Sequence, residues 1–149
     1  MQLNELLEEK GNEAHFLAAE SSVESAIAYM AEKHVGALII TRGKQPVGIF
    51  TERDLIRCHT THRGRPLEAI NIQEVMTNKL IVVEAHERVG AALAMMLKAG
   101  VSHLPVLRNG EVVAMLTLRD LAQHHLHSLE AELTHLHDYM ADFHEASRD

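Results

Sequence analysis

The hydrophobic pattern of the first third of the chain begins with apolar residues spaced three or four apart, as on one face of a helix. These residues are Val23, Ala26, Ile27 and Met30. The preceding Ser21-Ser22-Val23-Glu24 is typical of a capping box, in which side chains satisfy the first free backbone N–H groups of a helix. We therefore expect a helix that opens here and ends near Val35-Gly36.

Around this helix the apolar residues occur in short runs, which indicate strands. The runs Ala37–Thr41 and Val47–Phe50 flank the polar turn Arg42–Pro46 and predict a hairpin. Phe16–Ala18 predicts one more strand before the helix, and a second helix is expected after Thr51. The pattern is therefore β-α-β-β-α.

The same pattern returns further along the chain, so one structural unit is present twice. Gly48–Leu55 (GIFTERDL) matches Ala114–Leu121 (AMLTLRDL) at an offset of 66 residues (117 minus 51), with Thr, Arg, Asp and Leu kept in register. The second copy begins with the apolar segment Leu80–Val83, followed by a helical stripe of Val89, Leu93, Met96 and Leu97 that ends at Gly100. A strand at Leu104–Leu107 and a tight hairpin turn at Asn109-Gly110 follow.

Two stretches lie outside the duplicated unit. Cys58–Pro66 has no apolar periodicity and predicts a flexible linker. After the second copy, apolar residues follow 3,4,3,4,3 spacing, typical of a helix that packs along another helix. They are Leu126, Leu129, Leu133, Leu136, Met140 and Phe143. The expected division is residues 1–66 for the first repeat with an N-terminal helix and linker, 67–125 for the second repeat, and 126–149 for a C-terminal amphipathic helix.

Composition excludes several classes of protein. Hydrophobic residues at 46% and charged residues at 23% are ordinary globular values. No apolar run approaches the roughly 20 residues of a membrane span, and the acidic N-terminus differs from a secretory signal. The formal charge of −7 argues against nucleic acid as a partner, and the lone Cys58 excludes an internal disulfide. We expect a cytoplasmic protein that binds neither membrane nor nucleic acid.

The repeated Thr-x-Arg-Asp segments contain the candidate chemistry. Thr51 and Thr117 precede predicted helices, where free backbone N–H groups and the helix dipole favour an anion. Arg53 and Arg119 lie in the first helical turn, where a cation is unfavourable for the helix but suited to a phosphate. This pattern indicates a phosphate site at either turn.

The aspartates of these segments have two interpretations. Asp54 and Asp120, three residues after each Thr, offer acceptors for the two hydroxyls of a ribose. Thr-x-x-Asp is also a capping box, in which the carboxylate accepts a hydrogen bond from the cap residue. Two copies in register, each after a predicted strand, favour at least one nucleotide site. One copy can bind while the other only caps.

Several of these features together resemble a cystathionine-β-synthase (CBS) domain pair. They are the duplicated unit, Val75-Met76-Thr77, Ser102–Val106 (SHLPV) and the two Thr-x-Arg-Asp turns, and the resemblance covers about residues 10 to 125. It implies an α+β fold of two β-α-β-β-α repeats with pseudo-twofold symmetry. It also implies a regulatory module whose clefts bind adenosine-containing ligands such as AMP, ADP, ATP, NAD or S-adenosylmethionine, with the Asp on the ribose.

The resemblance groups the candidate nucleotide-binding residues into two clefts. The first comprises Ile49, Thr51, Arg53, Asp54, Lys79, Leu80, Val101, Ser102 and His103. The second comprises Phe16, Val35, Gly36, Ala37, Met115, Thr117, Arg119 and Asp120. If only one cleft is occupied, we expect the second, because apolar Leu118 competes less for Arg119 than Glu52 does for Arg53.

Each candidate also has a structural interpretation. Gly36, Ala37 and Ser102 are small enough to let a flat base lie against backbone. Val35 and Val101 are equally suited to core packing. For the candidate His103 the alternative to a phosphate contact is an ordinary hydrogen bond, and for Ile49 and Met115 the alternative to covering the base is the core.

Histidine is abundant, with 12 residues in the chain. Six lie in the C-terminal helix: His124, His125, His127, His135, His137 and His144. One-turn pairs such as His124 with His127 and Asp138 with Asp142 make metal binding across a dimer an alternative. Because these histidines are divided between the outer faces and the edges of the apolar stripe, we expect no metal site. A second hypothesis is that they make helix association depend on pH.

The function indicated is a regulatory protein that senses an adenosine nucleotide, needs no cofactor and is not an enzyme, since no catalytic triad, metal-hydrolase motif or Gly-rich phosphate loop is present. We expect a homodimer formed through the C-terminal helix; the alternative is that this helix covers the chain's own core. An effector protein is a further expected partner. The other functions left open are an interaction protein with empty clefts that acts through this helix, and a His-rich metal or pH responder.

Overall fold

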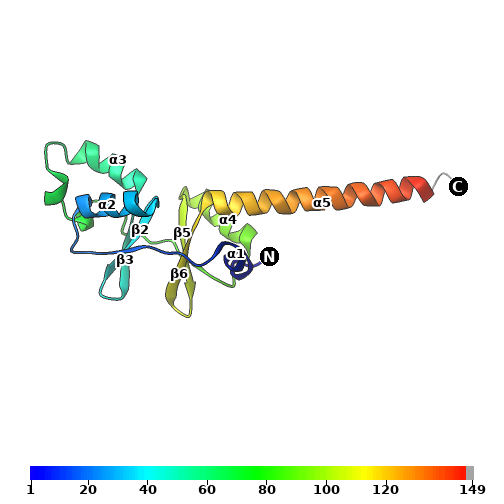
Figure 1. Ribbon diagram of the computed structural model, residues 1–149, viewed down its shortest axis with the longest axis horizontal. Coiled ribbons are helices and arrows are strands. Elements are labelled where there is room, and N and C mark those ends of the chain that lie inside the picture. Colours follow the sequence, from blue (N-terminus) through cyan, green and yellow to red (C-terminus); the bar gives the residue numbers. More distant parts are fainter. Residues whose placement is uncertain (147–149) are drawn as a thin grey trace. The chain divides into compact units, whose positions relative to one another are not determined.

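The computed structural model describes residues 1–146, with side chains described for residues 1–141. Its elements in chain order are α1 (Leu3–Lys10), β1 (Phe16–Ala18), α2 (Val23–Lys33), β2 (Ala37–Arg42), β3 (Gln45–Thr51), α3 (Glu52–Thr61), the 3-10 turns η1 (Leu67–Ala69) and η2 (Ile72–Glu74), β4 (Val83–Glu84), α4 (Val89–Ala99), β5 (His103–Arg108), β6 (Glu111–Thr117) and α5 (Leu118–Ala146) (Figure 1). The two expected β-α-β-β-α repeats are confirmed as two three-stranded sheets, ordered β1-β2-β3 and β4-β5-β6.

The chain divides into two compact units. Unit A comprises residues 12–82 and 105–115, and unit B comprises, of the described chain, residues 1–11, 83–104 and 116–146. Unit A therefore contains the first Thr-x-Arg-Asp turn, and unit B contains the second. None of the helices in the described part of the chain has the apolar length that a membrane span needs.

The sheet of unit A is covered by apolar residues of α2 and the 3-10 turns. β1 runs parallel to β2, and β2 runs antiparallel to β3 with Ala37 opposite Thr51. The buried cluster contains Ala19, Val23, Ala26, Met30, Leu38, Ile40, Phe50, Cys58, Ile70, Ile72 and Val75. Ser22 caps α2 by accepting a hydrogen bond from the Ser25 N–H at 3.1 Å. The helix ends at Lys33, slightly before the predicted end, because His34 adopts a left-handed conformation with φ of 56°.

The predicted linker from Cys58 to Pro66 is wrong in its first part. α3 continues to Thr61, and the hydroxyls of Thr60 and Thr61 donate to the Arg57 carbonyl at 2.8 and 2.9 Å. Cys58 is a buried helical residue in the core, and burial raises the pKa of its thiol. Apolar periodicity failed to reveal this last turn because α3 buries only Asp54 and Cys58 along its length.

The helices of unit B follow the predicted pattern with two differences. α4 ends at Ala99, and Gly100 directly after it, with φ of 68°, is the left-handed cap that the sequence predicts. Its buried residues are Val89, Ala92 and Met96, whereas Leu97 is 63% exposed, so the predicted place of Leu97 in the stripe is wrong. The segment Leu80–Val83 contributes only Val83 to a strand.

α5 is one continuous helix of 29 residues, so the predicted boundary between residues 125 and 126 lies inside it. The leucines of its predicted stripe are exposed, as is every described side chain from residue 125 to 141. The alternative in which these described residues cover the chain's own core is therefore wrong. The predicted roles of the side chains of Asp142, Phe143 and His144 lie outside the described residues.

Candidate functional site

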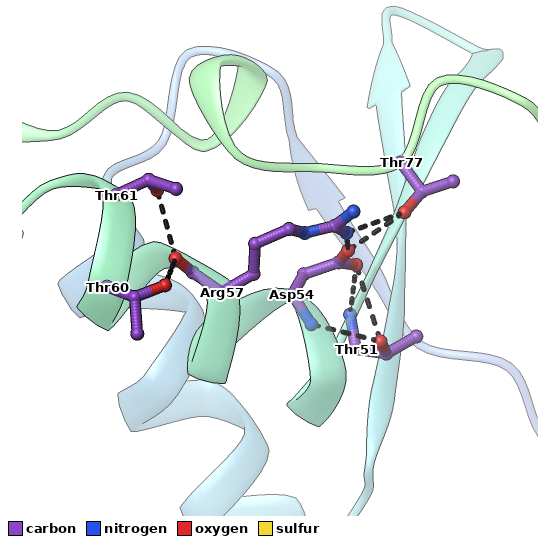
Figure 2. A network of polar contacts seen from close by, with 6 residues as sticks. All are labelled: Thr51, Asp54, Arg57, Thr60, Thr61 and Thr77. Carbon is purple, nitrogen blue, oxygen red and sulfur yellow. Dashed lines mark hydrogen bonds and ion pairs between the residues drawn. The ribbon is translucent and has the colours of Figure 1, made fainter.

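The first Thr-x-Arg-Asp turn is a complete capping box at the start of α3. The Thr51 N–H donates to Asp54 Oδ2 at 2.9 Å, and the Asp54 N–H donates to Thr51 Oγ1 at 3.4 Å (Figure 2). This reciprocal pair satisfies two of the backbone N–H groups that have no partner within a helix. The capping interpretation is therefore confirmed for the first copy.

Asp54 has two further partners that the sequence did not reveal. Its Oδ1 accepts a hydrogen bond from Thr77 Oγ1 at 2.8 Å and forms an ion pair with Arg57, as Figure 2 shows. The Asp54 side chain is only 2% exposed, whereas that of Arg57 is 58% exposed. Both carboxylate oxygens are thus engaged within the protein, and a ribose diol would have to displace these contacts.

The backbone beside the first turn is packed against the segment that contains Thr77. Ile49 and Thr77 exchange two backbone hydrogen bonds, at 2.9 and 2.8 Å. A Cβ at Gly48 would lie 2.6 Å from Met76 Sδ and 2.9 Å from the Thr77 carbonyl oxygen. Glycine is needed here because a side chain has no room, so Gly48 permits this close approach.

The second turn has the same cap in unit B. The Thr117 N–H donates to Asp120 Oδ2 at 2.8 Å, and the Asp120 N–H donates to Thr117 Oγ1 at 3.0 Å. The carboxylate also forms an ion pair, through Oδ2, with Lys10 at the end of α1. The side chains of Asp120 and Lys10 are 21% and 38% exposed, so solvent reaches both members of the pair.

The electrostatic environment favours an ionised Asp120. Burial raises the pKa of its carboxyl, but hydrogen bonds from Lys10 and Thr117 and the charge of Lys10 lower it by more, so the pKa of Asp120 lies below its ordinary value. An ionised carboxylate offers hydrogen-bond acceptors on both oxygens, and the Asp120 side chain is partly exposed to solvent. Asp120 therefore has the chemical properties required for a hydroxyl-bearing ligand.

The two turns differ at the positions around the aspartates. The equivalent of Arg57 in the second copy is Gln123 (57 plus 66), which carries no charge. The equivalent of the buried Ile49 is Met115, which is half-buried. The second copy therefore has an uncharged residue in place of Arg57 and a more exposed residue in place of Ile49.

Two other predicted residues contact the turns through their backbones. The Gly36 carbonyl accepts from the Glu52 N–H at 3.2 Å, beside the first turn, and the Ser102 carbonyl accepts from the Leu118 N–H at 2.8 Å, beside the second. The sequence grouping assigned each residue to the other turn, and that grouping stays a prediction. The remaining predicted residues are exposed (Phe16, Arg53, Lys79, Arg119), half-buried (Val35, Leu80, Val101, His103) or buried (Ala37).

Unit A also contains a pocket that the sequence did not reveal. Its volume is about 420 Å³, and it is lined by Ile27, Met30, Ala31, His34, Val35, Gly36, Glu52 and Leu55. Only Val35 and Gly36 of this lining were predicted site residues. Among the described residues, no group of three or more His, Cys, Asp or Glu side chains is arranged to hold a metal ion.

Comparison with known proteins gives a consistent family match. The family model described as CBS domain matches residues 12–59 and 72–127. The chain is 28% identical to the CBS domain-containing protein CBSX3, mitochondrial, of Arabidopsis thaliana, over 93% of this chain and 71% of that protein. The crystal structure of the CBS domain NE2398 matches with a TM-score of 0.78 and 30% identity, over 85% of this chain and 98% of that one.

A more distant match shares the fold. The CBS domain pair of protein MJ0100, crystallised in complex with 5-methylthioadenosine and S-adenosyl-L-methionine, has a TM-score of 0.74 and 20% identity, over 86% of this chain and 98% of that one. The predicted resemblance and the predicted α+β tandem fold are confirmed by these matches.

Proposed function

The chain belongs to the CBS domain family, and from this premise we propose that it is a regulatory module that senses an adenosine-containing nucleotide. CBS domain pairs are regulatory modules, and one member of the fold, MJ0100, was crystallised with two adenosine-containing ligands. In the proposal this chain acts by binding and not by catalysis. Candidate ligands are AMP, ADP, ATP, NAD and S-adenosylmethionine.

The observation that carries the proposal is the state of Asp120. Its carboxylate is ionised, 21% exposed and paired with a lysine that is itself 38% exposed. Solvent reaches both members of this pair and screens their attraction, so a ribose diol can replace Lys10 at a modest cost. Thr117 at the helix start and the exposed Arg119 in the first turn are the proposed phosphate contacts.

The first turn supports a different role. Replacing the contacts of Asp54 with Thr77 and Arg57 would remove hydrogen bonds from a carboxylate that is 2% exposed. Leaving such buried groups without partners costs about 1–3 kcal/mol each. We therefore assign the first turn to stabilisation of unit A and the second turn to nucleotide binding.

In the proposal the protein is cytoplasmic, and its partners are a second copy of the same chain, with which it forms a homodimer, and an effector protein. The exposed leucines of α5 support association with a second chain, because a face of this kind is ordinarily buried. The same leucines favour a second candidate function, that of an interaction protein that acts through α5 without a nucleotide.

A thermal-shift screen separates the two functions. A nucleotide at 100 times its dissociation constant adds about 2.7 kcal/mol to the stability of the folded state. We expect at least one of AMP, ADP, ATP, NAD and S-adenosylmethionine to raise the melting temperature of the wild type and to have no such effect on Asp120→Asn. If none of the five shifts the wild type at millimolar concentration, the interaction protein becomes the better account.

A further inference from the structure

The exposed face of α5 is an apolar surface without a described partner. This surface, the α5 stripe, consists of Leu126, Leu129, Leu133, Leu136 and Met140, which are 57, 43, 56, 53 and 60% exposed. Helices in water gain most of their stability by packing an apolar face, and a helix alone is marginal. The stripe therefore needs a second surface of matching spacing.

The spacing of the stripe assigns the residues of α5 to coiled-coil positions. Leu126, Leu133 and Met140 take position a, and Leu129 and Leu136 take position d. The same assignment places Ser128, Ala131, Thr134 and Asp138 on the outer face, which carries small or polar residues. A two-helix contact thus buries the leucines and leaves the outer face in water.

The residues that flank the stripe have complementary charge when two copies run parallel. In that arrangement position g of one helix faces position e of the other, five residues further along. His125 then faces Glu130 of the second copy, and Glu132 faces His137 of the second copy. Because the pairing is symmetric, four acid–imidazole contacts form.

An antiparallel arrangement matches the charges less well. Placing Leu129 opposite Met140 puts Glu130 opposite His137, but it also puts Glu132 opposite Tyr139, which is uncharged. Only two acid–imidazole contacts form, half the number in the parallel arrangement. Charge complementarity therefore selects a second copy of this chain, in parallel, as the occupant of the stripe.

We propose that α5 pairs with α5 of a second copy as a parallel two-stranded coiled coil, and that protonation of His125 and His137 strengthens the pair. The proposal deepens the homodimer of the proposed function and rests on it. It identifies the dimer surface, its orientation and a dependence on pH.

The direction of the pH dependence follows from the neighbours of these histidines. The residues three or four positions from His125 and His137 on their own helix are Leu121, Ala122, Ser128, Leu129, Leu133, Thr134, Met140 and Ala141, none of which is charged. A proton on either imidazole is therefore neutralised by a glutamate only in the paired state. Pairing therefore strengthens on acidification, as the imidazoles gain protons.

Two more histidines lie close to the glutamates. His127 is three residues before Glu130 and His135 is three residues after Glu132, so both form one-turn pairs on their own helix. These pairs exist in the single helix and in the paired helix alike. They change the strength of the intermolecular contacts but not the sign of the pH effect.

Sedimentation equilibrium of the full chain tests the dimer surface. We expect the wild type to dimerise, Leu129→Asp/Leu136→Asp to be monomeric, and the outer-face control Ala131→Asp to dimerise like the wild type. A double variant that dimerises as tightly as the wild type overturns the coiled coil while the homodimer stands. A wild type that is monomeric at every concentration overturns the homodimer as well, and the nucleotide screen remains an independent test of ligand binding.

Disulfide cross-linking tests the orientation. In the parallel arrangement residue 129 faces its own equivalent, so Leu129→Cys cross-links to a covalent dimer on oxidation. Buried Cys58 stays unreacted, and the wild type controls for it. If Leu129→Cys cross-links only when mixed with Met140→Cys, the helices are antiparallel and the proposal is wrong.

The pH dependence is tested with a matched charge variant. Between pH 7.5 and pH 5.8 we expect the dissociation constant of the wild type to fall about tenfold, the scale expected of four exposed charge pairs. Glu130→Gln/Glu132→Gln keeps the stripe and should associate with a constant that does not change over this range. Equal pH dependence in both proteins overturns the role of His125 and His137.

Discussion

The first and second Thr-x-Arg-Asp turns have the same backbone cap, but their aspartates differ in partners and exposure. Asp54 is 2% exposed and contacts Thr51, Arg57 and Thr77, while the side chain of Asp120 is 21% exposed and contacts Thr117 and Lys10. The same residue types therefore stand in two different environments. The environment decides whether the carboxylate stabilises the fold or is available to a ligand.

The difference arises from residues outside the motif. The first copy has Arg57 where the second has Gln123, and Gly48 where the second has Ala114. Gly48 lets the Met76-Thr77 backbone approach, and that approach brings the Thr77 hydroxyl to Asp54. Substitutions at these neighbours are the direct way to test the comparison.

The largest expected effect is the loss of Asp54. Asp54→Ala removes the acceptor for Thr77, Arg57 and the Thr51 N–H, and should destabilise the fold by about 3 kcal/mol. The matched Asp120→Ala removes a more exposed cap and should cost about 1 kcal/mol. Urea unfolding measures both, and equal losses would contradict the different environments of the two turns.

A side chain at Gly48 has the next largest effect. Gly48→Ala places a methyl group 2.9 Å from the Thr77 carbonyl oxygen and should cost about 2 kcal/mol through displacement of that backbone. The reverse change in the second copy, Ala114→Gly, should cost about 1 kcal/mol, the usual loss for glycine in a strand. A Gly48→Ala protein as stable as the wild type would show that the approach of Met76-Thr77 is not constrained.

Removal of the Thr77 hydroxyl has a smaller effect. Thr77→Val deletes a hydrogen bond of 2.8 Å to a buried carboxylate and should lower the free energy of unfolding by about 1 kcal/mol. The control is Thr60→Val, whose exposed hydroxyl donates only to the Arg57 carbonyl and whose loss should cost less than about 0.5 kcal/mol. A larger loss of stability in Thr60→Val than in Thr77→Val would contradict the role of the Thr77 hydroxyl.

The smallest effect is the acid sensitivity of the second turn. The pKa of Asp120 in the folded protein lies below its ordinary value of 3.8, so its ion pair contributes stability above that pH and loses it as the pH falls below it. Asp120→Asn and Lys10→Met should each lose less stability than the wild type when the pH falls from about 5 to about 3. Identical acid profiles for all three proteins would exclude a contribution of the pair.

Much of the fold was predictable because the same pattern of helices, strands and turns occurs in both copies. The left-handed cap at Gly100 and the tight turn at Asn109-Gly110, with φ of 53° and 77°, follow from residue types that favour positive φ. The end of α3 was not predictable, because its last turn is held by threonine hydroxyls and one buried cysteine. No hydrophobic period marks such a turn.

The candidate site was predictable only as a motif. Thr-x-Arg-Asp identified both turns, but it did not identify the partners that determine the environment of the two aspartates. Lys10 and Thr77 lie far in sequence from the aspartates they contact, and Arg57 is not part of the repeated motif. Lys10 reaches Asp120 across 110 residues of chain. Contacts of that separation depend on tertiary packing, which spacing along a sequence does not encode.

The central claim is that the second turn, and not the first, binds the nucleotide. Isothermal titration of AMP, ADP, ATP and NAD into the wild type, Arg119→Gln and Arg53→Gln tests it most directly, because both arginines are exposed and their replacement spares the caps. We predict that at least one nucleotide binds the wild type, that Arg119→Gln weakens it about tenfold or more, and that Arg53→Gln leaves it within about twofold. An equal loss in Arg53→Gln would contradict the claim, and so would failure of all four, together with S-adenosylmethionine, to bind the wild type.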